Sequence, residues 1–171
     1  MISDKMQKAL NDQINAELHS AYLYLSMSAY FTSLNLDGSA HWMRLQAQEE
    51  LMHGMKFYDY VNEAGGRALL GAVEAVPTEW KSPLAAFEAA LGHEQKMTRK
   101  INDLVGLAMA EKDHATYAML QWFVTEQVEE EANADDICKK IRFVGQDGPG
   151  MYMIDRELKT RVITPETAGQ A

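Results

Sequence analysis

The sequence has few of the residues that cross-link or interrupt a chain. Its 171 residues include one cysteine, Cys138, and four prolines. A single thiol excludes an intrachain disulfide framework and a cysteine-rich zinc site, and it suits a reducing cytosol, so we expect a cytoplasmic protein. No stretch approaches the ~20 consecutive apolar residues that a membrane-spanning helix needs. Charges at Asp4, Lys5 and Lys8 interrupt the N-terminal segment, so we expect no signal peptide.

Positive charge is also scarce. Lysine and arginine number 16, against 25 aspartates and glutamates, and the formal net charge is -9. We therefore expect no nucleic-acid and no membrane partner, whereas cations, including metal ions, are favoured. The length suits a single domain, residues 1–171, with a sizeable core.

The alternation of apolar and polar residues that is typical of strands is missing over any useful length. The chain is predicted to be helical almost throughout, with glycine and proline clustered between the helices. The expected N-terminal caps are Ser3, Asp113 and Ser82, the last of which is followed by Pro83. We predict four long helices and a short fifth, at about residues 4–34, 39–64, 83–111, 114–144 and 151–161.

The lengths of the connections predict the topology. Short turns make the first two long helices one antiparallel hairpin and the last two another. A long helix of this kind measures ~40 Å. The non-helical stretch 67–81 can span ~50 Å when extended, enough to return along the whole bundle. We predict an all-α four-helix bundle with one long crossover, although the lengths also allow an up-down bundle with a loose loop.

Each long helix carries a glutamate in the middle of its apolar stripe. Residues three and four apart share a helix face, and on these faces apolar residues flank Glu17, Glu50, Glu94 and Glu130. No lysine or arginine shares the stripes, and burying unpaired carboxylates is unfavourable. Two divalent metal ions would balance four negative charges. The alternative is a purely structural bundle in which the glutamates lie at a solvated edge.

One histidine supports the metal interpretation. His53 follows Glu50 by three residues on the same face, which is the Glu-x-x-His ligand pair of carboxylate-bridged di-metal bundles. A donor set of mostly carboxylate oxygen with one imidazole suits iron or manganese better than a structural zinc site.

Four segments then show a resemblance to a known family. Residues 9–17, 20–27, 48–53 and 126–131 closely resemble bacterial and archaeal non-haem ferritins, and the likeness extends from Ile2 to about Thr164. The resemblance implies a ferritin-like bundle whose short fifth helix lines the four-fold axes of a closed shell of 24 copies. It implies that Fe(II) is oxidised by O2 or H2O2 at a di-iron ferroxidase centre and is stored as a ferric mineral. An oxidase or peroxidase that retains two irons or manganese ions is the alternative.

The resemblance also assigns residues to roles. Glu17 and His53 match ligands of the first iron, Glu50 matches the bridging carboxylate, and Glu94 and Glu130 match ligands of the second iron. Gln127 occupies a glutamine position beside these ligands. Glu49, Glu126 and Glu129 match a third iron site, although their spacing alone would favour a solvated acidic face. Tyr24 and Trp122 match aromatic residues close to the centre and are candidate one-electron donors; on their own they would be core residues. Haem is not expected, because Leu51 stands where bacterioferritins carry the haem-binding methionine.

Overall fold

Four long helices and one short helix make up most of the described chain. The computed structural model describes residues 2–145 and 148–163. The helices are α1 (Asp4–Ser33), α2 (Asp37–Glu63), α3 (Pro83–Glu111), α4 (His114–Val144) and α5 (Gly148–Leu158). The side chains of Ser3, Ser82 and Asp113 accept hydrogen bonds from backbone N–H groups in the first turns of α1, α3 and α4. All three predicted caps are therefore confirmed.

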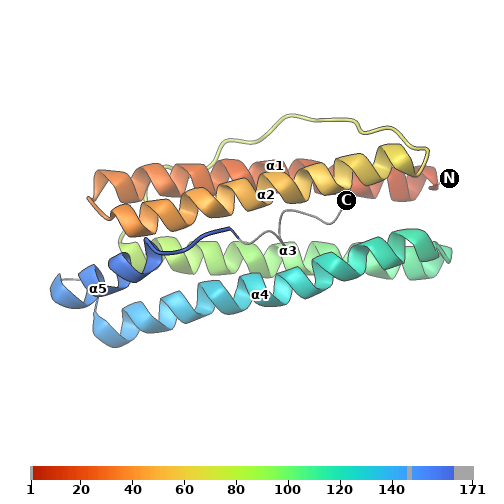
Figure 1. Cartoon of the computed structure of the whole chain (residues 1–171). Coiled ribbons are helices and arrows are strands. Elements are labelled where there is room, and N and C mark those ends of the chain that lie inside the picture. The colour runs from red at the N-terminus through yellow and green to blue at the C-terminus, as the bar shows by residue number, and fades with distance from the viewer. Residues whose placement is uncertain (1, 146–147, 164–171) are drawn as a thin grey trace.

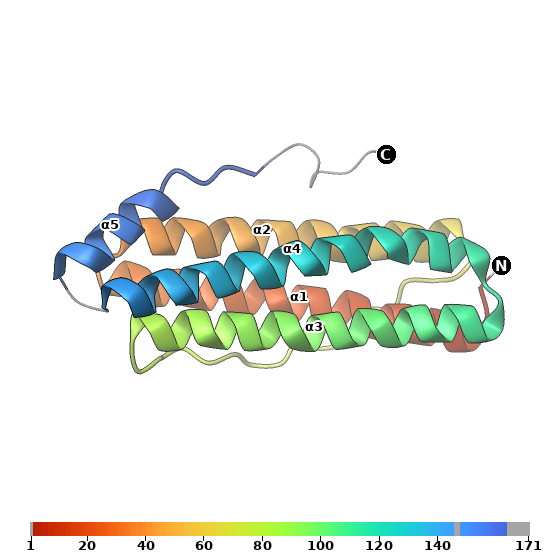
Figure 2. The ribbon, with the colours of Figure 1, turned by 90° about the horizontal axis from the view of Figure 1, so that it is seen from below.

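The long helices form two antiparallel hairpins, α1 with α2 and α3 with α4 (Figure 1). Between them, the chain leaves α2 at one end of the bundle and returns along the outside to start α3 at the other end (Figures 1 and 2). Helices α2 and α3 are consequently parallel. The bundle has the predicted single crossover, and the up-down alternative is wrong. None of the described helices is long and apolar enough to cross a membrane.

Polar side chains of α1 hold the crossover in place. Asn11 Oδ1 accepts a hydrogen bond from the Leu69 backbone N–H at 2.9 Å, and its amide donates to Arg67 O at 3.0 Å. Farther along, Asn15 accepts from Gly71 N at 3.0 Å and Ser26 Oγ donates to Pro77 O at 2.6 Å. An extended segment forms few backbone–backbone hydrogen bonds of its own. These side chains of α1 therefore serve as hydrogen-bond partners for the backbone N–H and C=O groups of the crossover. The stretch predicted as a crossover is thus pinned along α1.

The apolar core has two parts. One cluster, near α5, includes Phe31, Met43, Phe87 and Ile137, and the other, at the far end, includes Leu10, Phe57, Ile101 and Phe123. On every long helix, the central glutamate of the stripe lies in sequence between residues of the two clusters. The layer of four glutamates therefore has an apolar cluster on each side, and its surroundings are of low polarity.

Helix α5 corrects one prediction. It spans Gly148–Leu158, three residues earlier at each end than the predicted 151–161. Pro149 is compatible with the first helical turn, where N–H groups have no intrahelical acceptor, so the Gly-Pro-Gly segment begins the helix and does not precede it. At the other end, Thr160 N and Arg161 N donate to carbonyls only three residues back, and this tighter turn ends the α-helix.

A buried aspartate attaches α5 to the bundle. Asp155 accepts hydrogen bonds from Gly38 N at 3.0 Å, Ser39 N at 2.7 Å and Ser39 Oγ at 2.9 Å. These N–H groups belong to the first turn of α2, whose own N-cap residue, Leu36, makes no side-chain capping bond. Asp155 therefore caps α2 from outside, and α2 begins at Asp37, two residues before the predicted start at residue 39.

Candidate metal centre

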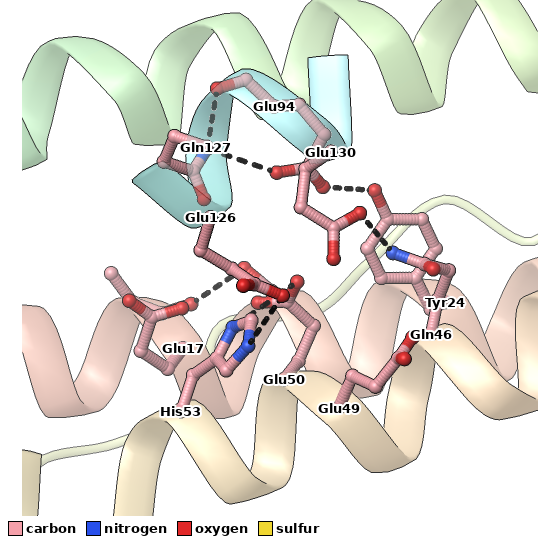
Figure 3. Close-up of polar contacts among 12 residues, drawn as sticks. Glu17, Tyr24, Gln46, Glu49, Glu50, His53, Glu94, Glu126, Gln127 and Glu130 are labelled. Atoms are coloured by element: carbon pink, nitrogen blue, oxygen red, sulfur yellow. Dashed lines mark hydrogen bonds and ion pairs between the residues drawn. The ribbon is translucent and has the colours of Figure 1, made fainter. Parts of the chain in front are cut away.

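The polar side chains predicted from the helical stripes lie together in the structure. Glu17 comes from α1, Glu50 and His53 from α2, Glu94 from α3, and Glu130 from α4 (Figure 3). Each is at most 3% exposed, and Gln127 is 6% exposed. The alternative of glutamates at a solvated edge is therefore wrong.

Three of these residues form one candidate metal-binding group. Oxygen atoms of Glu17 and Glu50 and a ring nitrogen of His53 all lie within 4.8 Å of one another. His53 Nδ1 is 3.8 Å from Glu50 Oε1, too far for a good hydrogen bond. Glu50 Oε1 and His53 Nε2 are buried, and neither has a hydrogen-bond partner among the described residues. Buried polar atoms without partners are rare, and both of these belong to residues of a candidate metal-binding group, where a cation would satisfy them.

A second group shares the same imidazole. His53, Glu126 and Glu130 also offer donor atoms within 4.8 Å of one another, and His53 Nε2 lies 3.9 Å from Glu126 Oε1. Glu94 belongs to neither group. Its carboxylate accepts hydrogen bonds from the Tyr24 hydroxyl and, at 3.2 Å, from Gln127 Nε2. Glu94 is thus in the layer, turned toward α1 and α4.

Glutamines orient two further carboxylates. Gln13 Nε2 donates to Glu17 Oε1 at 2.8 Å, and Gln46 Nε2 donates to Glu130 Oε2 at 2.7 Å. Both glutamines lie on the inward stripes, although neither was among the predicted site residues. The sequence does contain a signal for this role. Each glutamine lies one helical turn before a predicted ligand, Glu17 or Glu50, at a stripe position where an apolar core residue would be expected. Such hydrogen bonds hold a carboxylate in place without neutralising its charge.

Protonation reflects the crowding of carboxylates. Burial, with the charge of Glu94, raises the pKa of Glu17 to about 7. Burial and the charges of Glu94, Glu17 and Glu130 raise the pKa of Glu50 well above its usual range, and burial likewise raises the pKa of Glu130. None of the ion pairs within the described residues joins a lysine or arginine to these carboxylates. Without a metal ion, the layer therefore keeps protons near neutral pH.

Burial lowers the pKa of His53 to about 4, so its imidazole is neutral near pH 7 and needs to lose no proton to bind a metal. The raised pKa of Glu17 and the lowered pKa of His53 make the stability of the metal-free protein depend on pH in opposite directions. The stabilising contribution of the protonated carboxyl of Glu17 is complete below about pH 4.5 and is lost as the pH rises through about 7. That of the neutral imidazole is present above about pH 6.5 and is lost as the pH falls through about 4.

Binding of Zn(II), which cannot be oxidised, is expected to release more than one proton per chain at pH 7, because the metal needs ionised carboxylates. Its affinity should increase between pH 6 and 8. Titration calorimetry in buffers of different ionisation enthalpy measures the released protons. Glu50→Gln has no proton to lose at that position and should release fewer. Zinc binding without proton release would contradict the raised carboxyl pKa values.

The residues of the predicted third site are exposed to different degrees. Glu49 is 4% exposed and Glu126 is partly buried, whereas Glu129 is exposed. Glu49 Oε2 accepts a hydrogen bond at 2.6 Å from Arg161, a residue beyond α5 that was not among the predicted site residues. No periodic signal could reveal this pair, because the two residues lie in segments whose relative position depends on how α5 docks.

Both predicted aromatic residues lie beside the carboxylate layer. Tyr24 is fully buried and donates its hydroxyl hydrogen to Glu94. The ring of Trp122 meets that of His53 nearly edge-on, with centroids 5.4 Å apart, and Lys56 Nζ lies 4.3 Å from its centroid. Tyr24 and Trp122 thus each contact a predicted ligand of the centre. Their roles as electron donors stay predictions.

The single crossover and the buried layer of carboxylates around one imidazole define a ferritin-like four-helix bundle, a class that binds metal ions between its helices. The model of the ferritin-like domain family matches residues 7–144. The chain belongs to the ferritin family.

Known relatives resemble the chain over nearly its whole length. The bacterial non-heme ferritin of Bacteroides fragilis (strain 638R) is 46% identical over 161 residues, which cover 94% of this chain and 100% of that protein. The bacterial non-heme ferritin of Staphylococcus aureus (strain MRSA252) is 38% identical over 166 residues, covering 97% and 100%. A crystal structure described as an open pore ferritin from Archaeoglobus fulgidus is 57% identical, with a TM-score of 0.94, covering 95% of this chain and 100% of that one.

Proposed function

We propose that this protein stores iron by oxidising Fe(II) at a di-iron centre and depositing the ferric product as a mineral inside a hollow shell of identical chains. The observation that carries the proposal is the buried layer of carboxylates from all four long helices, in which Glu50 Oε1 and His53 Nε2 have no hydrogen-bond partner within the part of the chain that the structure describes. Membership of the ferritin family supports iron as the metal.

The substrate ions are assigned to residues as follows. Glu17 and His53 bind the first Fe(II), and Glu50 bridges it to the second. Glu94 and Glu130 bind the second Fe(II), while Tyr24 and Gln127 donate hydrogen bonds to the Glu94 carboxylate. Glu49, Glu126 and Glu129 form the third iron site beside the pair.

The chain contributes geometry and charge to the reaction. Four helices bring hard oxygen donors together, so that two Fe(II) ions can each give one electron to O2 or H2O2. Gln13 and Gln46 orient Glu17 and Glu130, and the apolar clusters on both sides exclude water. Because most ligands are carboxylates, the ferric product is expected to exchange out of the centre and pass to the mineral.

Storage requires an enclosed volume that one bundle does not have. The proposal therefore includes a closed shell, with 24 copies as the expected number from the family resemblance.

Aerobic addition of Fe(II) to the metal-free protein tests the proposal. We expect rapid oxidation, followed by near-ultraviolet absorbance, and hundreds of irons per particle retained in a large soluble assembly. Size-exclusion chromatography with iron analysis measures the second result. Saturation at two or three irons per chain in a small oligomer would contradict storage and would instead indicate an oxidase or peroxidase that keeps its metals.

A further inference from the structure

A cation from the end of the described chain already lies on the predicted third iron site. Arg161 follows α5, and its Nη2 donates to Glu49 Oε2 at 2.6 Å. The guanidinium also stacks on the ring of Trp42, 4.7 Å from the centroid, and its Nη1 lies 3.5 Å from Trp42 O. The backbone is held as well, because Arg161 O lies 2.9 Å from His41 Nε2. Arg161 is thus attached to α2 through three of its residues.

The carboxylate that it contacts belongs to an acidic cluster. The Glu49 side chain is 5% exposed, against 19% for Arg161. Burial, together with the negative charges of Glu129 and Glu49, raises the pKa of Glu126. Burial also raises the pKa of Glu49 and Glu130, and the charge of Arg161 opposes the increase at all three carboxyls. A buried carboxylate among like charges needs a counter-ion, and in this structure a guanidinium supplies it.

We propose that Arg161 is an internal counter-ion that competes with a divalent metal ion for Glu49, so that metal binding at the third site displaces the guanidinium from α2. The inference rests on the proposed function, because the third site is part of that centre. A metal ion bound to Glu49 would lie a few ångströms from the guanidinium, and the two positive charges would repel each other. The divalent ion carries twice the charge and can also bind Glu126 and Glu129.

The position of Arg161 permits this exchange. It is partly exposed, and its segment has left the regular helix, so the guanidinium can turn away from Glu49 and Trp42 into solvent. Occupancy of the third site is thereby linked to the docking of residues 159–163. The first two metal sites have no such competitor among the ion pairs of the described residues, which predicts that they fill before the third.

Titration of the assembled, metal-free protein with Zn(II) alone tests this competition. Calorimetry should resolve two tighter sites per chain and a weaker third. In Arg161→Gln the third site should bind roughly tenfold more tightly, the factor for loss of a partly buried ion pair, while the first two change little. Arg161→Lys keeps the charge and should stay close to the wild type. Lys159→Gln removes a charge from the same segment, where it pairs at 3.4 Å with exposed Asp37, and should leave the third site unchanged.

Hydrogen exchange gives a second readout. In the wild type, filling the third site should accelerate amide exchange in residues 159–163, and in Arg161→Gln exchange should be fast before zinc is added. A third site that is unchanged or weaker in Arg161→Gln, with the first two sites intact, would overturn the inference and leave the proposed function standing. Absence of zinc binding at any site in the wild type would overturn both.

Discussion

Glu50→Gln is expected to slow the rapid oxidation of Fe(II) by at least about a hundredfold, since loss of even an outer-shell partner of a metal site costs ~10–100-fold. The amide keeps the volume of the carboxyl but cannot bridge two metal ions as an anion. Glu50 Oε1 is also one of the buried atoms that have no hydrogen-bond partner in residues 2–145 and 148–163. Stopped-flow absorbance after anaerobic Fe(II) loading and mixing with oxygen measures the rate.

Glu50→Gln is expected to change the stability of the metal-free protein in the opposite direction to its effect on oxidation. The pKa of Glu50 is raised in the folded protein, so its stabilising contribution is lost as the pH rises above about 4.5. Glutamine does not titrate, and metal-free Glu50→Gln should therefore gain stability relative to the wild type between pH 5 and 7.5. Urea unfolding at both pH values measures this gain. Glu63→Gln makes the same change at an exposed position of α2 and should affect neither property. Oxidation at the wild-type rate in Glu50→Gln would rule out a bridging role.

Gly38→Ala is expected to destabilise the protein by about 1–3 kcal/mol or more, the usual range for overpacking. A Cβ atom at Gly38 would lie 1.6 Å from the Asp155 backbone oxygen, so α5 would have to move. Movement of α5 would break the three hydrogen bonds through which Asp155 caps α2. Urea unfolding measures the loss, and faster amide exchange in α5 would localise it.

Gly106→Ala is the matched control for this substitution. Gly106 lies on an exposed face of α3, and no atom would lie within 4 Å of an added Cβ. Alanine there should stabilise the protein by about 0.5–1 kcal/mol, because it has the better helix propensity. The two substitutions should thus have opposite signs. A Gly38→Ala protein as stable as the wild type would show that α5 is not held tightly against α2.

The sequence predicted most of the bundle because its signals are local and repeated. Helix caps depend on a few neighbouring residues, and Ser3, Ser82 and Asp113 were found from such neighbours. The central layer was equally accessible, since a glutamate inside an apolar stripe is visible from a period of 3.6 residues. The error at the start of α2 has a cause that is distant in sequence. That boundary depends on Asp155, which reaches Gly38 only after α5 docks.

The sequence by itself determined that this is a helical bundle whose four long helices each bury a carboxylate, and it indicated the ferritin family. Helical periodicity and connection length suffice for that, because both concern residues close together in the chain. Only the tertiary structure decided how those carboxylates are oriented. In the folded protein, Glu94 accepts a hydrogen bond from Tyr24, Glu130 accepts one from Gln46, and Glu49 accepts one from Arg161. Such pairs join segments that are far apart in sequence, and their geometry exists only once the helices have packed.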